Sequence, residues 1–373
     1  MNGYFDYNAT TPLHTAASDA WLRASEKHWH NPSSLYRDAG LASHQLESAR
    51  ERLGNLMGAE AERIVFTSGA TESNNALFTS LPADAVVVIS AIEHPSVREA
   101  ARGRNVMELP VNAAGVVEVD ELKQLIISKR PALVSVMAAN NESGALQPWR
   151  ELAALCREQD VLFHTDAAQW LGKLDAANLG ECDFITGSAH KFGGGKGCGF
   201  LVLPTEDSRL GFIRGGPQEH GRRAGTENYP AIEAMVTALE TVTPRLSEIE
   251  HTQSKLRDGF IAALRARFEL LRVISESAPR LWNTVLMVMP EHDNLKWLTR
   301  LSRRGFSIST GSACSSGKEG SSVVVTALGA SAEELKRVVR ISGGWDTKVA
   351  DWQALEAAFF EVFEELNRGG RPQ

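Results

Sequence analysis

The chain has 373 residues, 43% of them hydrophobic and 23% charged, which is the balance of a globular protein of about two domains. Its formal net charge of −7 argues against nucleic acid or an anionic membrane surface as a partner. No apolar run approaches the ~18 residues of a membrane helix, and the first residues lack the pattern of a secretory signal. The four cysteines form no CxxC pair, so we expect a reducing, cytoplasmic location.

The first two thirds of the chain alternate strand-like and helical sequence. An amphipathic helix over 38–58, which Gly58 should end, precedes six short apolar runs. Their near-continuous apolar character is typical of strands covered on both faces. Helical stretches between them predict an α/β fold, with a mostly parallel sheet sandwiched by helices. The expected strands are 63–69, 85–90, 132–138, 161–166, 182–188 and 199–204.

The last third of the chain has a different pattern. Helical sequence continues from 231 to 268, where Pro244 should kink or break it. From about residue 270, short strands alternate with helices, which predicts a smaller α+β domain. We therefore divide the chain into an N-terminal segment that joins the small domain, a large domain and a small C-terminal domain. Their ranges are 1–15, 16–250 and 251–373.

The residues that follow each strand are the first candidates for a site, because ligands in open parallel sheets bind beyond the carboxyl ends of strands. After the first strand, Gly69 allows a tight turn into a helix, where the amides of Ala70 and Thr71 point outward. Such a helix start binds phosphate well. Ser68 or Thr71 also fits as an ordinary N-cap, so this motif alone leaves both readings open.

Three further polar residues stand at strand ends. His94 follows the second strand and is either an acid–base or ring-stacking group or a structural hydrogen-bonding residue. Asn141 lies in a turn that could present an amide to a ligand, although asparagine is common in turns. Asp166 ends a buried strand and needs either several hydrogen-bond donors or a cationic partner, for which Mg²⁺ and a protonated heterocyclic nitrogen are both candidates.

The glycine-rich stretch GSAHKFGGGKGCG over 187–199 contains two lysines, Lys191 and Lys196. Neither the P-loop pattern nor the dinucleotide pattern G-x-G-x-x-G fits its spacing. Pyridoxal phosphate (PLP) fits the whole set better, since it needs a lysine for a Schiff base, an acidic partner for its ring nitrogen, a phosphate cup and a group beside the ring. Lys191, Asp166, the turn 68–71 and His94 would supply these four.

At this point the chain resembles the cysteine desulfurases of the class V, fold-type I PLP enzymes, the nitrogen-fixation and iron–sulfur-assembly branch. The resemblance covers nearly the whole sequence and implies a seven-stranded sheet in the large, PLP-binding domain. Its motifs are FDYNATTP (5–12), NPSS (31–34), IVFTSGATESNN, EHPSV, NNESG, HTDAAQ, GSAHKFGGGKGCG, RRAGTEN (222–228), STGSACSSG (309–317) and RISGG (340–344).

The resemblance implies a role for each matching residue and no metal ion. Lys191 would carry PLP, Asp166 would pair with its ring nitrogen, and His94 would stack on the ring. Gln169 and Asn141 would contact the phenolic oxygen or the substrate. The phosphate would be bound by Ala70, Thr71, Ser188 and His190, and by Thr226 of a second subunit in a homodimer with shared active sites.

The resemblance also implies the substrate and the reaction. Arg340, with help from Asn31, would bind the carboxylate of L-cysteine. Cys314, on a loop of the small domain, would take the sulfur as a persulfide and release L-alanine, while His94 would handle the thiol proton. A sulfur-acceptor protein, either an iron–sulfur scaffold or a tRNA-thiolation protein, would follow. The alternatives are a selenocysteine lyase and another class V aminotransferase. Lys196 has no counterpart role, and we expect Cys198, which flanks the glycine stretch, to be structural.

Overall fold

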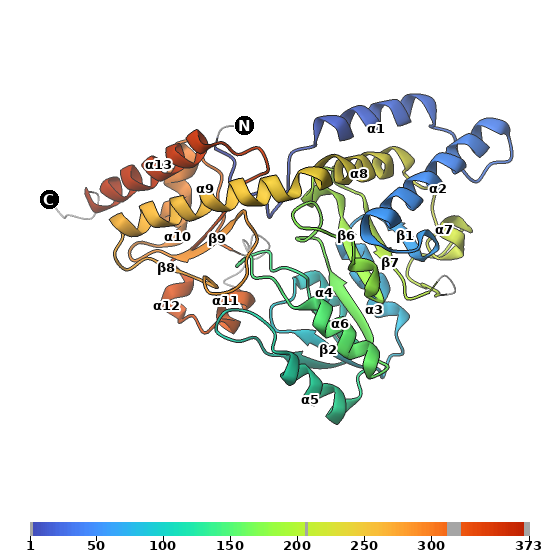
Figure 1. Cartoon of the computed structure of the whole chain (residues 1–373), viewed down its shortest axis with the longest axis horizontal. Coiled ribbons are helices and arrows are strands. Elements are labelled where there is room, and N and C mark those ends of the chain that lie inside the picture. The colour runs from blue at the N-terminus through green and yellow to red at the C-terminus, as the bar shows by residue number, and fades with distance from the viewer. Residues whose placement is uncertain (1–2, 206–207, 312–321, 369–373) are drawn as a thin grey trace.

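The computed structural model describes residues 3–205, 208–311 and 322–368, and its largest element is a seven-stranded sheet (Figure 1). Strand β7 is antiparallel to both of its neighbours, and the other adjacent pairs are parallel. The predicted α/β fold with a mostly parallel sheet is therefore confirmed. In spatial order the strands are β1 (Ile64–Thr67), β7 (Gly199–Val202), β6 (Phe184–Ser188), β5 (Leu162–Asp166), β4 (Leu133–Ser135), β2 (Val86–Ser90) and β3 (Asn105–Leu109).

Helices cover both faces of this sheet, which explains why its strands are apolar on consecutive residues. In β1, Ile64 and Phe66 pack into one core, whereas Val65 packs into the core on the opposite face. No helix in the described ranges is long and apolar enough to cross a membrane. The helices of this part are α1 (Thr15–Lys27), α2 (Arg37–Met57), α3 (Ala70–Ser80), α4 (Pro95–Ala100), α5 (Val119–Lys129), α6 (Trp149–Glu158), α7 (Gln218–Gly221) and α8 (Tyr229–Val242).

Two predicted helix boundaries are present. Helix α2 ends at Met57, and Gly58 follows in the left-handed conformation with φ of 66°. A Cβ atom at Gly58 would lie 2.2 Å from the carbonyl oxygen of Ala177, so only glycine fits there. Pro244 lies in a short 3₁₀ turn, Thr243–Arg245, that separates α8 from α9 (Leu246–Arg267).

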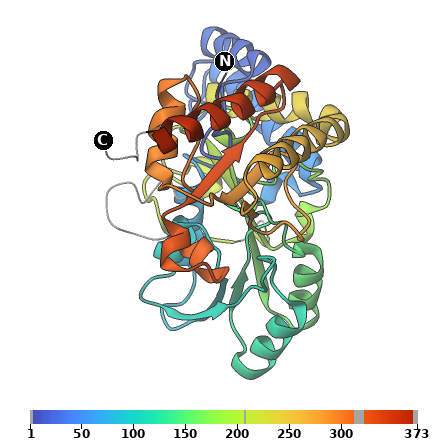
Figure 2. The ribbon, with the colours of Figure 1, turned by 90° about the vertical axis from the view of Figure 1, so that its left-hand side faces the viewer.

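A second, antiparallel sheet forms the smaller part of the molecule (Figure 2). Phe5 from the N-terminal segment is fully buried in its core, and Asp6 bridges to Ser342 in its edge strand. Its strands lie in the order β10 (Val338–Ser342), β9 (Thr284–Val288), β8 (Arg272–Val273). The helices of this part are α10 (Asn294–Arg303), α11 (Val323–Ala327), α12 (Ala332–Leu335) and α13 (Val349–Arg368).

Helix α9 joins the two parts of the chain, as its long course across Figure 1 shows. Leu246 and Ile249, near its start, belong to the core of the large sheet. Phe260 and Leu264, further along, belong to the core of the small sheet. The division that we place at residue 250 falls inside this helix and stays a prediction.

A buried ion pair fixes the edge of the large sheet at β1. Arg50 of α2 donates from Nη1 and Nη2 to the carboxylate of Glu219, at 2.7 and 3.0 Å, and both side chains are 1% exposed. Glu219 also accepts the backbone N–H of Phe66 at 2.8 Å. Its carboxylate therefore ties α2, β1 and α7 together.

We expect Glu219→Gln to lower the free energy of unfolding by about 3 kcal/mol or more, because it leaves the buried Arg50 charge without its main partner. Urea unfolding followed by circular dichroism measures the change. Glu47→Gln is the matched control: Glu47 pairs with the same guanidinium from a side chain that is 42% exposed, so its loss should cost less than about 1 kcal/mol. Equal effects of the two variants would contradict the assignment.

Candidate active site

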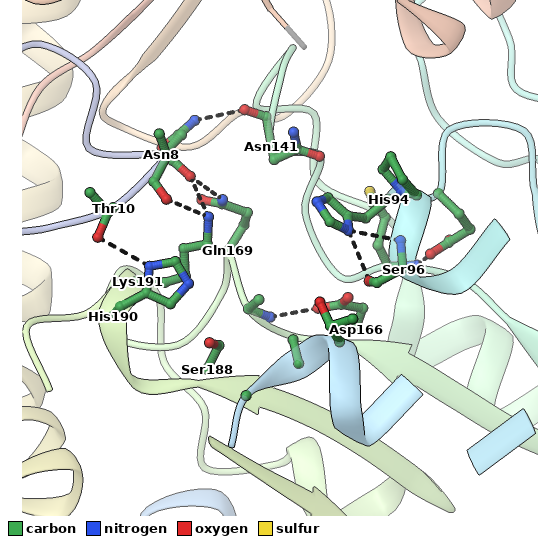
Figure 3. A pocket seen from close by; sticks show the side chains of 18 of the residues that line it. Asn8, Thr10, His94, Ser96, Asn141, Asp166, Gln169, Ser188, His190 and Lys191 are labelled. Atoms are coloured by element: carbon green, nitrogen blue, oxygen red, sulfur yellow. Dashed lines mark hydrogen bonds between the residues drawn. The ribbon is translucent and has the colours of Figure 1, made fainter. Parts of the chain in front are cut away.

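A cavity of about 690 Å³ lies beyond the carboxyl ends of β2, β5 and β6 (Figure 3). It brings together most of the residues that the sequence predicts for a site. Lys191 and His190 lie on one side of the view, and His94 lies on the other. The predicted residues that line the cavity are Ala70, Thr71, His94, Asn141, Asp166, Gln169, Ser188, His190, Lys191 and Arg340.

Lys191 ends a short 3₁₀ turn that follows β6 directly. Its Nζ donates to the carbonyl oxygens of Asn8 and Ala9, both at 2.8 Å. The N-terminal segment also bonds to the residue before it, since Thr10 Oγ1 lies 3.1 Å from Nδ1 of His190. The segment thus forms one wall of the cavity and directs the Lys191 amine into it.

Two glycines of the stretch 187–199 allow a close approach of backbone. A Cβ atom at Gly199 would lie 2.6 Å from the carbonyl oxygen of Gly187 and 2.6 Å from Cα of Gly69. At Gly187 it would lie 2.3 Å from the ring of Phe200. The glycines therefore let β6, β7 and the turn before α3 meet beside the cavity.

The turn before α3 has the geometry of an anion site. Gly69 precedes the helix with φ of 146°, a conformation that favours glycine. The first backbone N–H groups of an α-helix lack intrahelical partners, so those at the start of this helix, which lines the cavity, suit a phosphate. Ser188 lies close by, since its Oγ is 3.5 Å from the position of a Cβ atom built on Gly69.

Asp166 is a buried carboxylate, 6% exposed, at the end of β5. Its Oδ2 accepts Asn74 Nδ2 at 3.1 Å, and its Oδ1 accepts the N–H of Ala168 at 3.0 Å. Within the described ranges its partners are neutral. A cation bound in the cavity would complete its surroundings, because a buried charge is costly without a counter-charge.

The His94 ring caps helix α4 through Nδ1, which accepts the N–H of Ser96 at 3.1 Å. Burial lowers the pKa of His94; the charge of Asp166 opposes this shift, and that of Lys191 adds to it. Burial also lowers the pKa of His190 to about 4, with contributions from Lys191 and Lys196. Both imidazoles are therefore favoured in the neutral form at neutral pH.

Two buried glutamates at the cavity were absent from the sequence-based site. Glu93 is fully buried; its Oε1 accepts Ser90 Oγ at 2.6 Å and the N–H of Met137 at 2.7 Å. Burial raises the pKa of Glu93 to about 8. Burial also raises the pKa of Glu142, although its hydrogen bond from Ser322 opposes the shift.

Arg340 is 2% exposed and reaches the cavity from β10 of the small sheet. Its Nη2 donates to Asp6 Oδ1 at 2.6 Å, and its Nη1 donates to the carbonyl oxygen of Asn141 at 3.0 Å. Its Nε is buried and has no hydrogen-bond partner in the described part of the chain. The guanidinium therefore keeps donor capacity for a second carboxylate.

Gln169 is held by groups that the sequence did not indicate. Its Nε2 donates to the carbonyl oxygen of Asn8 at 2.9 Å, and its Oε1 accepts Lys173 Nζ. Lys173 is 3% exposed, and burial lowers its pKa well below the usual range, with the charges of Lys191 and Arg340 adding to the shift. Lys173 does not directly follow a predicted strand, so the argument from strand ends did not include it.

Two predicted residues, Thr226 and Asn31, lie outside the cavity. Thr226 is exposed and does not line the cavity of its own chain. Asn31 is also exposed, and its Oδ1 accepts the N–H of Ser33 at 3.0 Å outside the cavity. Cys314 lies outside the described residues. Lys196 is exposed and lies at the cavity's edge, and Cys198 is buried.

Comparison with known proteins places most of the chain in one family. The class-V aminotransferase family matches residues 3–355. The chain belongs to this family. Cysteine desulfurase IscS of Methanosarcina thermophila is 35% identical over 353 residues, which are 91% of this chain and 87% of that protein.

Solved structures of related proteins have the same fold. The NifS-like protein of Rickettsia africae is 30% identical, with a TM-score of 0.88 over 98% of this chain and 100% of its own. The structure of SspA in complex with cysteine is also 30% identical, with a TM-score of 0.80 over 91% of this chain and 98% of its own. Members of this family are similar to the present chain over nearly its full length.

The residues around the cavity fit PLP, the cofactor of class-V aminotransferases. Asp166 is a buried carboxylate with neutral partners, which suits a protonated ring nitrogen. The N-terminus of α3 suits the phosphate, and the Lys191 amine points into the same space (Figure 3). These three groups thus match the cationic ring nitrogen, the anionic phosphate and the aldehyde of that cofactor.

The raised pKa of Glu93 predicts a pH-dependent effect of Glu93→Gln on stability. The pKa of about 8 in the fold lies above the ordinary 4.5, so the stability that Glu93 contributes is complete below pH 4.5 and is lost as the pH rises to 8. Glutamine mimics the protonated acid. The variant should therefore gain on the native chain between these pH values, by up to about 1.4 kcal/mol per pH unit.

Urea unfolding at several pH values between these limits measures the difference. Glu99→Gln, an exposed position on α4, is the matched control and should show no such trend. A difference between native chain and Glu93→Gln that is constant with pH would show that Glu93 is ionised in the fold.

Proposed function

We propose that this chain is a PLP-dependent cysteine desulfurase, which converts L-cysteine to L-alanine and keeps the sulfur as a persulfide on Cys314. The convergence of Lys191, Asp166 and the start of α3 on one cavity carries this proposal. Relatives that are 33–37% identical over most of the chain and bear the name cysteine desulfurase support it. The reaction balances, since L-cysteine and the Cys314 thiol give L-alanine and the Cys314 persulfide.

Bound PLP supplies an electron sink that makes the Cβ–S bond of cysteine labile. Lys191 holds the cofactor and moves the proton at Cα of the substrate, for which its amine points into the cavity. Asp166 keeps the ring nitrogen protonated. Asn141 and Gln169 contact the phenolic oxygen or the substrate, and Ala70, Thr71, Ser188 and His190 bind the phosphate.

Arg340 binds the substrate carboxylate with the donors that Asp6 and Asn141 leave unused. The fork of a guanidinium pairs with a carboxylate through two parallel hydrogen bonds, which fixes the substrate's orientation as well as its affinity. Asn31 is proposed to assist, from outside the cavity of the single chain.

The other three cysteines are unsuited to accept sulfur. Cys156, Cys182 and Cys198 are all buried. Burial raises the pKa of Cys156 and of Cys198 to about 12, and it raises that of Cys182 further. Because the thiolate is the nucleophile, thiols with such pKa values are inert at neutral pH. This supports Cys314, the remaining cysteine of the sequence, as the acceptor.

We further propose a cytoplasmic homodimer with shared active sites. Thr226 is exposed and would complete the phosphate site of a second copy. Large apolar side chains are exposed along α1 and the segment that follows it, which suits a covering subunit. The persulfide would pass to an iron–sulfur scaffold or a tRNA-thiolation protein.

Lys191→Ala should abolish covalently attached PLP and lower alanine formation from cysteine by about 10²–10⁴-fold or more, since the proton-moving amine is lost. Borohydride reduction followed by mass spectrometry of the labelled peptide measures attachment. Lys196→Ala, the exposed lysine of the same stretch, is the matched control and should keep the label. Label retained in Lys191→Ala would place the attachment on another residue.

Cys314→Ser should abolish persulfide formation and reduce sulfur transfer to background, because no thiolate attacks the substrate sulfur. Mass spectrometry after incubation with L-cysteine or L-selenocysteine maps the persulfide, and an alanine assay follows turnover. Cys198→Ala is the control, as its thiol is buried. Normal sulfur transfer by Cys314→Ser would overturn the mechanism. Alanine formed from selenocysteine alone would favour a selenocysteine lyase, and transamination without sulfur release would favour another class-V aminotransferase.

A further inference from the structure

A chain of hydrogen bonds connects Asp166 to His94 beside the cavity, and Figure 3 shows its last link, between Ser96 and His94. Asn74 of α3 is fully buried, and its Nδ2 donates to Asp166 Oδ2 at 3.1 Å and to Ser96 Oγ at 2.9 Å. Ser96 of α4 is 8% exposed, and its Oγ lies 2.8 Å from Nδ1 of His94. The sequence assigned no role to Asn74 or to Ser96.

The direction of each hydrogen bond between Asp166 and His94 is determined by groups that can only donate or can only accept. The backbone N–H of Ser96 can only donate, and it lies 3.1 Å from His94 Nδ1, so Nδ1 is an acceptor. An ionised Asp166 carboxylate can only accept, so the amide of Asn74 must turn its Nδ2 towards it. Ser96 Oγ then accepts from Asn74, and its own hydrogen goes to His94.

His94 Nδ1 therefore accepts two hydrogen bonds, one from the backbone N–H of Ser96 and one from its hydroxyl. A nitrogen that accepts in this way carries no proton. The single proton of the neutral imidazole must be on Nε2. Among the described residues, the hydrogen bonds of the His94 ring all fall on Nδ1, and the ring lines the cavity.

Charged groups near the ring come from several elements. Asp166 of β5 favours the imidazolium, whereas Lys191 opposes it together with burial. Glu93, the preceding residue, is bonded to Ser90 and Met137. Arg98 of α4 pairs with Glu108. The result for His94 is a pKa below its ordinary value, which agrees with a neutral ring.

We propose that Asn74 and Ser96 are positioning residues that hold His94 in the neutral Nε2–H tautomer, so that it acts in the cavity as a hydrogen-bond donor and not as a base. A ring in this state cannot take a proton from the cavity, because Nε2 already carries one and Nδ1 faces two donors. In this state His94 does not move the thiol proton of the substrate. It polarises a ligand group in the cavity by donating a hydrogen bond from Nε2. The catalytic half of the inference, that His94 acts as a hydrogen-bond donor in the reaction, rests on the proposed function. The assignment of the tautomer does not.

Nitrogen NMR of the full chain with ¹⁵N-labelled histidine tests the tautomer directly, both with bound cofactor and after its removal. His94→Asn identifies the signals of His94. At neutral pH we expect a protonated Nε2 and an unprotonated Nδ1. A proton on Nδ1 in the native chain would overturn the inference without any further variant.

Variants test the two positioning residues. Ser96→Ala removes a hydrogen bond to the neutral ring, so the pKa of His94 should rise by about half a unit to one unit. Asn74→Ala should shift it in the same direction, and Ser96→Thr, which keeps the hydroxyl, should restore it. Asn75→Ala is the matched control, because the side chain of this neighbour on α3 has a single hydrogen bond within the described ranges, to the carbonyl oxygen of Thr71. An unchanged His94 pKa in Ser96→Ala would contradict the proposal.

Kinetics separates this inference from the proposed function. Nε2 carries a proton in the imidazolium as well as in the neutral ring, so the acid limb of kcat/KM for alanine formation should stay in place in Ser96→Ala while the imidazole pKa rises. If the native chain forms no alanine, the proposed function fails while the tautomer result stands. If alanine forms and the acid limb moves in parallel with the imidazole pKa, His94 acts as a base and the catalytic half is wrong.

Discussion

One buried residue, Asn8, connects the two sheets and Lys191 through its backbone and its side chain. It is 1% exposed, and its carbonyl oxygen accepts Lys191 Nζ at 2.8 Å and Gln169 Nε2 at 2.9 Å. On the other side, its N–H donates to Ser342 Oγ at 3.0 Å and its Nδ2 donates to Thr284 Oγ1 at 2.8 Å. An unmade hydrogen bond here would cost about 1–3 kcal/mol. The direction of the Lys191 amine therefore depends on the N-terminal segment, which in turn is bound to the small sheet.

The sheet could be predicted because its central strands are buried on both faces, which leaves a continuous apolar run for each of them. Strand β3 was missed for the opposite reason: it is the edge strand, and only Leu109 among its residues is buried. Helix α1 was missed because its buried face consists of Ala17, Ala20 and Ala24, which give a weak apolar pattern, while Trp21 is exposed. A sequence pattern reveals an element through its large buried apolar residues, and β3 and α1 have few of these.

The strand-end residues of the site could be predicted because the topology of a parallel sheet brings such residues to one edge. His94, Asp166 and Lys191 indeed line one cavity. Asn8 and Lys173 could not be found in this way, because their contacts join residues 165 positions apart and depend on the packing of the two sheets. Asn74 points to Asp166 from the second turn of α3, and only the register of that helix on the sheet places it there.

The buried titratable groups around the cavity are shifted so that the site receives anions. Burial raises the pKa of Glu93 to about 8, which favours its neutral form at neutral pH, and burial also raises the pKa of Glu142. Burial lowers the pKa of Lys173, which avoids a further buried cation beside Lys191. The groups proposed to bind a ligand are then the start of α3, Arg340 and Asp166, and each favours a different ligand group. A phosphate would meet the start of α3, a carboxylate would meet Arg340, and a protonated ring nitrogen would meet Asp166, so each ligand group has one favourable place in the cavity.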